Sequence, residues 1–331
     1  MPDKIVYLFG AGATHAELSN AYPADANTEK FEIEKGLLMR HVSLRVIQRA
    51  YDDAEYIRGI SGIISKTGAN IEQLISLLES IRIEDSYKKA NTLRRLIEED
   101  ISQHLIFPRD GNYPILYKSL LEFHQQDLVK QKEELFGLIT LNYDDLLDNA
   151  YKQIFQTDCI PYCRSQNETR DIPLLKLHGS FGWKHKIGTI ESNTPIIPPG
   201  IRKNYLEIPF NYIWGKAFEL LVQCNKLRVI GCSLEQTDWG LIELLFKVHI
   251  WRKEPFEIEI ISSEHTGIRI KKNYGFFPKI TTLTKLENNL IPDQQPDNIF
   301  KEWIVAKANR LLKNQENIQR TIYLKQLCGF D

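Results

Sequence analysis

Long apolar runs are missing from this chain. No uninterrupted apolar stretch approaches the roughly 18–20 residues that a membrane-spanning helix needs. The first residues, Met1 to Lys4, lead directly into a short apolar segment, without the hydrophobic region and cleavage site of a signal peptide. Hydrophobic residues make up 43% of the sequence, and the mean hydropathy is −0.32. We therefore expect a cytoplasmic protein that does not enter a membrane.

The sequence also lacks an excess of charge of either sign. Its 42 basic and 43 acidic residues give a net charge of −1. Such a balance creates no overall field that would attract nucleic acid. A local group such as Arg269, Lys271 and Lys272 is short enough to be an ordinary solvated surface. No direct binding of nucleic acid is expected.

Cysteine is scarce, with five residues in 331. An odd count in a cytoplasmic protein indicates reduced thiols. Cys159 and Cys163 are the closest pair, and no second pair follows them. A structural zinc site usually needs four ligands, so we expect that no metal is bound.

Short apolar segments of strand length recur between helical stretches. They are 4–9, 138–140, 174–177, 227–230 and 256–261, and most end in glycine or small polar residues. Near-continuous apolar strands that alternate with helices are typical of a parallel sheet covered on both faces. The sequence therefore predicts an α/β fold with a Rossmann-like, doubly wound parallel sheet.

The spacing of these segments is uneven, because about 120 residues separate the first two. Within this interval Ile71, Leu74, Ile75, Leu78 and Ile81 fall on one helical face, with Asn70 and Gln73 at capping-box positions. We expect a helical insert over about 29–132 within a catalytic domain of residues 1–290. An amphipathic helical tail is expected over 291–331. No internal repeat is present.

Polar or glycine-rich motifs follow the predicted strands, at the edge where open α/β sheets bind ligands. The first is GAGAT at 10–14, where backbone N–H groups and a helix N-terminus favour a pyrophosphate. It lacks the third glycine of the dinucleotide fingerprint. A tight turn with close helix–sheet packing explains it equally well.

Two further motifs bring groups capable of acid–base chemistry and orientation. TLNYD at 140–144 places Asn142 and Asp144 at a strand end, where an Asx turn that caps the next helix is the structural alternative. KLHGS at 176–180 places His178 before a glycine, with a pKa near neutrality by default. A lone histidine is more often structural, and the loop residue His185 is interpreted in that way.

The last two motifs suit phosphate or ribose. VIGCSL at 229–234 offers Gly231 and Ser233, with Cys232 as a small buried residue and Asp238 further on. After the next strand, residues 262–264 (SSE) offer polar groups to a ribose or an adenine edge.

Taken in order, these motifs resemble the sirtuin superfamily. The shared elements are the Gly-Ala-Gly turn, T-x-N-x-D, L-H-G, G-x-S-L and a late polar strand end, and the match extends from Lys4 to Glu264. Protein-deacylating sirtuins usually carry two C-x-x-C pairs after the histidine, whereas 180–227 contains only Cys224. They also carry a Pro-Asp-Phe-Arg loop, where this chain has YPADAN at 22–27. Both departures and the long insert are similar to the zinc-free sirtuin-like NAD hydrolases of bacterial antiphage defence.

The resemblance implies an NAD+ glycohydrolase that cleaves NAD to nicotinamide and ADP-ribose. His178 would act as base, Asn142 would position the water or a ribose hydroxyl, and Asp144 would hold the nicotinamide carboxamide. NAD would be the substrate and no metal would take part. The implied NAD-binding residues are Gly10, Ala11, Gly12, Ala13, Thr14, Asp25, Thr140, Gly231, Ser233 and Glu264.

Two alternatives remain open. One is an NAD-dependent protein deacylase or an ADP-ribosyltransferase, and the other is a non-catalytic NAD or ADP-ribose binding module that regulates a partner. A free NAD hydrolase would be toxic, so we expect a separate sensor or regulatory protein, for example an ATPase. We also expect a homo-oligomer built through the helical insert or the C-terminal tail, whose apolar stripes exceed the needs of one small core.

Overall fold

The computed structural model describes most of the chain between residues 1 and 311. The described ranges are 1–22, 34–53, 71–105, 107, 113–156, 172–180, 185–187, 190–192, 196–197, 205–206, 208–234, 238–252, 257–262, 264–274, 280–283 and 298–311. Asp25, Asn70, Cys159, Cys163 and Ser263, which the sequence singled out, lie outside them.

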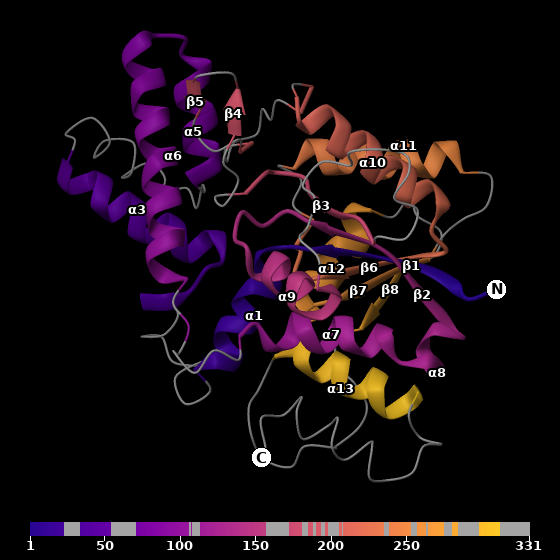
Figure 1. Ribbon diagram of the computed structural model, residues 1–331. Helices are drawn as coiled ribbons and strands as arrows, with labels where there is room; N and C mark the ends of the chain where they lie inside the picture. Colours follow the sequence, from indigo (N-terminus) through magenta and orange to yellow (C-terminus); the bar gives the residue numbers. More distant parts are fainter. Residues whose placement is uncertain are drawn as a thin grey trace.

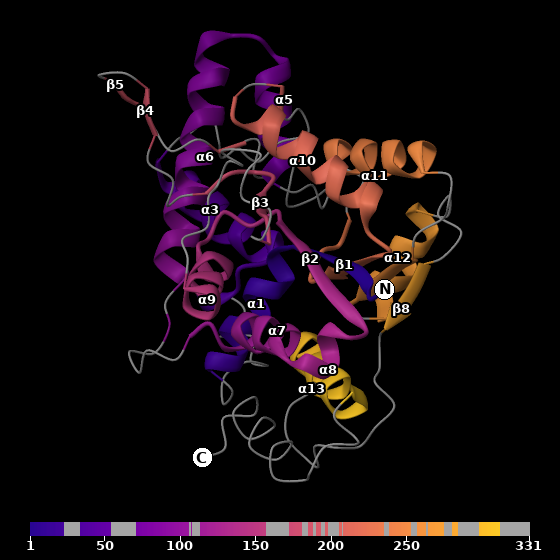
Figure 2. The same ribbon diagram turned by 45° about the vertical axis from the view of Figure 1, so that its right-hand side comes forward.

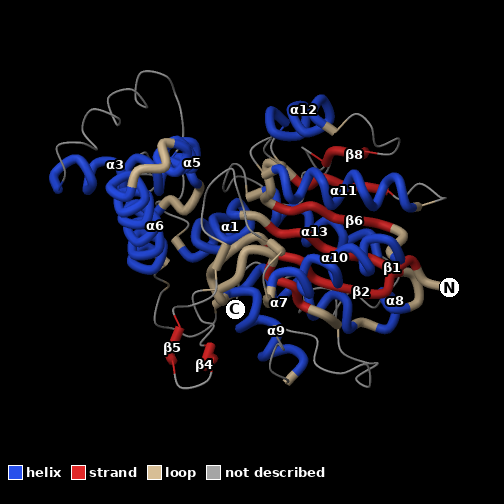
Figure 3. Tube along the Cα trace, turned by 90° about the horizontal axis from the view of Figure 1, so that it is seen from above, coloured by secondary structure: helices blue, strands red, loops and turns tan. Residues whose placement is uncertain are grey.

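A parallel sheet forms the centre of the described structure. Its strands are β1 (Asp3–Phe9), β2 (Glu133–Thr140), β3 (Leu174–Lys176), β6 (Lys226–Ile230), β7 (Glu257–Ile261) and β8 (Ile280–Leu283). They pair in the order β3-β2-β1-β6-β7-β8, and every pairing is parallel (Figure 3). The chain therefore winds outwards in two directions from β1 and β6, which leaves a topological switch point between them. This confirms the predicted doubly wound, Rossmann-like fold.

The strands form because their side chains are buried on both faces. In β1, Val6 and Leu8 pack on one side while Ile5 and Tyr7 pack on the other, and all four are buried. Five of the six strands were predicted to within a few residues. β8 was missed because its sequence, ITTL, has no continuous apolar run. A separate hairpin of β4 (His185–Ile187) and β5 (Ile190–Ser192) was also missed.

Helices cover both faces of the sheet, as a parallel sheet requires. One face is covered by α10 (Phe210–Gln223), α11 (Trp239–Trp251) and α12 (Glu264–Asn273). The other face is covered by α1 (Ala11–Ala21), α7 (Ile115–Gln125), α8 (Asp127–Lys130), α9 (Leu146–Phe155) and α13 (Ile299–Leu311). None of the described helices has both the length and the apolar character needed to cross a membrane.

Three helices form a module with a core of its own. They are α3 (Met39–Asp53), α5 (Ile71–Ser80) and α6 (Glu84–His104), which bury an apolar cluster separate from the two sheet cores. Figures 1 and 3 show this helical module beyond the carboxyl ends of the strands. The predicted insert of about 29–132 thus contains two kinds of helix, since α7 and α8 lie on the sheet.

Helix α13 packs against the sheet beside α7 (Figure 2). Its side chains Phe300, Trp303 and Ile304 are buried there. Within the helical module, Leu74 and Leu78 are likewise buried. These apolar side chains motivated the prediction that the insert or the tail builds an oligomer. Because they are buried inside one chain, they no longer indicate an oligomer, and the oligomeric state stays a prediction.

A buried ionic network fastens α13 to the sheet. The guanidinium of Arg228 is fully buried and donates to Glu133 at 2.7 Å and to Glu259 at 2.6 Å. It also donates to the hydroxyl of Tyr7, and Lys307 of α13 donates to Glu133 at 2.7 Å. Although burial opposes ionisation of Glu133, the adjacent cations hold the pKa of its carboxyl well below the usual range.

Candidate active site

The turns that follow β1 and β6 meet at the switch point with almost no space between them. The N–H of Gly10 donates to the carbonyl of Ile230 at 3.0 Å, and the N–H of Gly12 donates to the carbonyl of Gly231 at 2.8 Å. Gly231 has a φ of +61°, and a Cβ there would lie 2.1 Å from the nitrogen of Ala13. The glycines therefore allow backbone to pack on backbone, which is the structural explanation that the sequence left open. Their contact with a pyrophosphate remains a prediction.

Asn142 joins the end of β2 to the first turn. Its Nδ2 donates to the carbonyl of Gly10 at 3.0 Å and to the hydroxyl of Thr14 at 2.9 Å. Its backbone N–H donates to the hydroxyl of Thr140, the last residue of β2, at 3.1 Å. Asn142, Thr14 and Thr140 are all buried. The first two sequence motifs thus form a single hydrogen-bonded unit.

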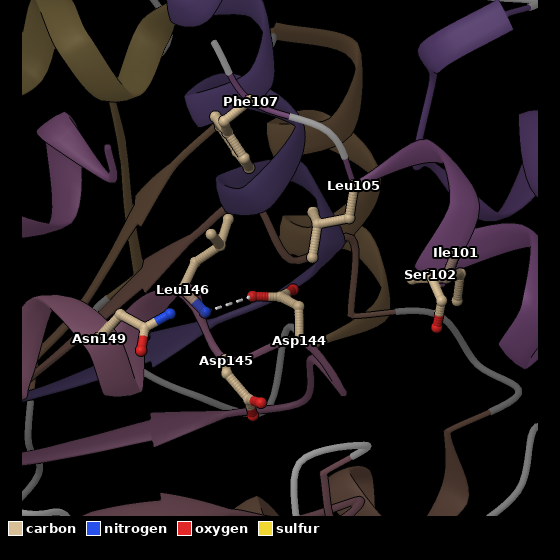
Figure 4. Close-up of a pocket in the computed structure, with 8 residues that line it drawn as sticks. All are labelled: Ile101, Ser102, Leu105, Phe107, Asp144, Asp145, Leu146 and Asn149. Carbon is tan, nitrogen blue, oxygen red and sulfur yellow. Dashed lines mark hydrogen bonds between the residues drawn. The ribbon is translucent and has the colours of Figure 1, made fainter. Parts of the chain in front are cut away.

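Asp144 extends this unit to the start of α9. One carboxylate oxygen accepts from the hydroxyl of Thr14 at 2.7 Å, and the other accepts from the N–H of Leu146 at 3.1 Å (Figure 4). The second bond is the helix-capping Asx turn that the sequence allowed. Burial raises the pKa of the Asp144 carboxyl, which the Lys176 ammonium and the bond from Thr14 offset in part.

Lys176 supports the same turn from β3. Its buried ammonium group donates to Asp145 at 3.1 Å and to Asp148 at 2.8 Å, and also to the carbonyl of Asp144. Burial lowers its pKa, but the three aspartates outweigh burial, so the net shift is upward and the group is charged. Lys176, the last residue of β3, thereby fixes the turn that carries Asn142 and Asp144.

A cavity of about 410 Å³ lies beside Asp144 (Figure 4). Its walls come from the end of α6 with the segment that follows it, and from the start of α9. The lining residues are Ile101, Ser102, Leu105, Phe107, Asp144, Asp145, Leu146 and Asn149. This cavity shares Asp144 with the strand-end motifs, but His178 and Gly10 do not line it. Since the groups capable of chemistry lie at the strand ends, we place the candidate site there.

His178 lies at the end of β3, next to the turn that carries Asn142. Its Nδ1 is 3.2 Å from the carbonyl oxygen of Leu141. A carbonyl only accepts hydrogen bonds, so the proton of the neutral ring is on Nδ1 and the lone pair is on Nε2. Nε2 lies 3.6 Å from a carboxylate oxygen of Asp238. Both residues are buried. This arrangement is suited to accepting a proton, because the carboxylate stabilises the imidazolium that forms.

Neighbouring groups fix the position of His178. The indole of Trp214 donates to the carbonyl of Leu177 at 2.9 Å, and the backbone N–H of Ile197 donates to the carbonyl of His178 at 2.8 Å. The hydroxyl of Tyr143 donates to the carbonyl of Ile197 at 2.8 Å. The rings of Tyr143 and Trp214 lie 6.1 and 6.5 Å from the imidazole, measured between centroids.

Asp238 is the residue of this site whose role the sequence interpretation missed. It occupies the N-cap position of α11, which follows the turn after β6. The signal was an aspartate placed directly before an apolar helix, only a few residues beyond the motif at 229–234. Its position at the start of a helix was thus foreseeable, whereas its approach to His178 depends on the sheet order.

The remaining predicted residues are less closely involved. Ala11 is exposed and Ala13 is buried in α1, while Ser233 is half-buried in the turn after β6. Glu264 begins α12, but its side chain lies outside the described atoms, as does Asp25 altogether. Among the described residues, no group of three or more histidine, cysteine or acidic side chains could hold a metal ion. The pair Cys159 and Cys163 lies outside that search.

Comparison with known protein families finds one match. Residues 137–249 correspond to the SIR2-like domain. This stretch begins in β2, ends in α11, and contains Asn142, Asp144, His178 and Asp238. No curated protein matches the chain. The match therefore covers the part of the chain that carries most of the candidate site.

Solved structures of Sir2 proteins align with much of the chain at low similarity. One, described as "Structural Basis for the Mechanism and Regulation of Sir2 Enzymes", has 14% identity and a TM-score of 0.41, over 93% of this chain and 94% of that one. A Sir2 homolog–NAD complex has 13% identity and a TM-score of 0.40, over 84% and 83%. These values are low, so the fold assignment above depends on the strand order of this chain.

Proposed function

We propose that this protein is an NAD+ glycohydrolase whose general base is His178. One observation carries the proposal: the ring of His178 donates from Nδ1 to Leu141 and presents Nε2 towards Asp238, at the carboxyl edge of a doubly wound sheet. That edge is where such sheets bind nucleotides. The SIR2-like match over residues 137–249 supports the same assignment.

The reaction needs a water, a base and an orienting group. Hydrolysis breaks the bond between the ribose C1′ and the nicotinamide nitrogen, and the bonding electron pair leaves with nicotinamide. The oxygen of water forms the new bond to C1′, and its proton passes to Nε2 of His178. Asp238 stabilises the resulting imidazolium, as an opposite charge at 3.6 Å does in a buried setting. The products are nicotinamide and ADP-ribose.

Asn142 and Asp144 complete the proposed site. Asn142 orients the water or a ribose hydroxyl, and Asp144 accepts from the carboxamide of nicotinamide. In the structure these side chains already bond to Gly10, Thr14 and Leu146. Binding of NAD must therefore exchange or share some of these bonds. The backbone N–H groups at the start of α1 and Ser233 are proposed to meet the pyrophosphate.

The biological role proposed is antiphage defence by depletion of cellular NAD. Restraint of such an activity requires a regulator, and we propose a separate sensor protein, for example an ATPase. NAD cleavage is expected to rise when the chain is combined with the product of a neighbouring gene.

Product analysis tests the activity directly. The purified chain, alone and with the neighbouring gene product, is incubated with NAD, and nicotinamide, ADP-ribose and cyclic ADP-ribose are separated by chromatography. Equal release of nicotinamide and ADP-ribose without an acceptor is the expected result. Nicotinamide release that depends on an acyl-lysine peptide or a protein acceptor would instead show a deacylase or a transferase. Saturable NAD binding without any product, in the presence of the activating partner, would show a binding module.

A further inference from the structure

Helix α11 is apolar on two opposite sides, although only one side meets the sheet. Leu241, Leu244, Leu245 and Val248 are buried against β6, β7 and α10. The opposite side exposes Trp239, Phe246 and Ile250 at 65%, 44% and 66% of their surfaces, and Trp251 at the end of the helix is exposed at 70%. A helix that is apolar all round is usually covered all round. Figures 1 and 2 show α11 in the outer layer of the fold, beside α10.

The exposed side chains form an ordered stripe. Trp239, Glu243, Phe246 and Ile250 follow one another at intervals of four, three and four residues, the spacing of a helix–helix seam. Trp251 and Lys247 flank this stripe, and the ring of Trp251 contacts Phe218 at 6.0 Å between centroids. We call the four residues together with Trp251 and Lys247 the α11 stripe.

The size of the stripe fits a protein interface. At these exposed fractions, side chains of this size present roughly 500 Å² for the four apolar residues together. A stable interface takes about 800 Å² from each partner, so the stripe supplies more than half. The largest apolar patch on a typical monomer is of about this extent and is often functional.

The charged residues of the α11 stripe favour a second copy of α11, packed antiparallel, as the partner that covers it. Glu243 and Lys247 form an ion pair at 2.6 Å, and Glu243 also accepts from the hydroxyl of Tyr205 at 2.8 Å. The neighbouring Lys247 and Tyr205 lower the pKa of the Glu243 carboxyl, so it is charged. Two copies of α11 that pack antiparallel about a two-fold axis would place Trp239 opposite Ile250. Glu243 would then lie opposite Phe246 and beside Lys247 of the second copy. Parallel packing would instead set Glu243 against Glu243.

We infer that the α11 stripe is the interface of an antiparallel, two-fold homodimer of this chain. An interface of this kind is isologous, so each residue pair occurs twice. The inference is independent of the proposed function, since it needs no NAD chemistry. It places the predicted homo-oligomer on α11 rather than on the insert or the tail.

Charge exchange within the stripe gives a matched test on the full-length chain. The mass in solution is measured by light scattering and sedimentation at micromolar concentration. Wild type is expected to be dimeric. Either Glu243→Lys or Lys247→Glu alone places like charges beside each other at both symmetric contacts between positions 243 and 247 of the two copies. The dissociation constant of the dimer is expected to rise about tenfold. The double variant with both changes restores opposite charges and is expected to recover the dimer.

Phe246→Asp provides a second variant, expected to weaken the dimer on the order of 100-fold while the thermal midpoint of the monomer hardly changes. A monomeric wild type would overturn the inference. A dimer that persists in Phe246→Asp would place the interface elsewhere. Failure of the double charge exchange to restore the dimer would show that α11 does not meet a second α11. A monomer that loses thermal stability in Phe246→Asp would show that another segment of the same chain covers the stripe.

Discussion

Replacing Gly231 by alanine tests the close contact between the two turns at the switch point. A Cβ at this position would lie 2.1 Å from the nitrogen of Ala13 and 2.4 Å from the carbonyl carbon of Gly12. Both are backbone atoms, so the strain cannot be relieved by moving a flexible side chain. The left-handed conformation at φ +61° costs alanine roughly 1–2 kcal/mol, and overpacking costs about 1–3 kcal/mol more. We expect Gly231→Ala to reduce the free energy of unfolding by about 2–5 kcal/mol.

Gly215→Ala is the matched control. Gly215 lies inside α10, and a Cβ there would meet no atom within 4 Å. Alanine is the better helix former, so this variant is expected to gain about 0.5–1 kcal/mol. Urea unfolding followed by tryptophan fluorescence measures both variants against wild type. If Gly231→Ala lay within about 0.5 kcal/mol of wild type, the described packing of backbone on backbone would be wrong.

Three further predictions concern stability and metal. Arg228→Met removes the buried cation that Glu133 and Glu259 share, leaves Glu133 with Lys307, and is expected to cost about 3–5 kcal/mol. Arg95→Met, in a mostly exposed pair with Glu99, should change stability by less than about 0.5 kcal/mol in the same urea assay, and equal effects would contradict this contrast. Burial lowers the pKa of His124 to about 3, so the folded state resists a proton that the unfolded state takes up near pH 6.5. Stability should therefore be complete above pH 6.5 and decline as the pH falls towards 3, a decline that His124→Gln should reduce. NAD cleavage should persist in EDTA, and elemental analysis that found one zinc per chain would instead favour a zinc-dependent deacylase.

The sequence predicted the sheet because most of its strands contain a short, largely apolar segment that ends in a distinct motif. β1, β2, β3, β6 and β7 carry this signal, whereas β8, at one edge of the described sheet, has the sequence ITTL, in which two threonines interrupt the apolar residues. The pattern of polar and apolar residues alone also could not show which helices between β1 and β2 pack on the sheet and which form the separate helical module. α5 and α7 are both amphipathic, and only the three-dimensional structure shows that one packs within the module and the other on the sheet.

The sequence predicted that the strand-end motifs share one edge of the sheet, but not how their side chains bond, and their part in NAD chemistry stays a prediction. The motifs at 10–14, 140–144 and 176–180 do meet, because parallel strands end at the same edge. The sequence placed Asn142 at a strand end. It is buried, and its amide bonds to Gly10 and Thr14. Loss of these bonds is expected to cost about 1–3 kcal/mol, so Asn142→Ala would mix effects on activity and stability. The approach of His178 to Asp238 joins the end of β3 to a helix after β6, a contact that depends on strand order.

The variant His178→Ala therefore tests whether His178 is the general base of NAD cleavage. His104→Ala is the matched control, because His104 lies at the end of α6 and its ring bonds only to Asp100 among the contacts described. Nicotinamide release and melting temperature are measured on the same samples, under conditions in which the wild type cleaves NAD. We expect His178→Ala to slow release by ~10²–10⁴-fold at a temperature at which its melting curve shows the variant to be folded, while His104→Ala keeps the wild-type rate. Nicotinamide release by His178→Ala at the wild-type rate would contradict the role of His178 as the base.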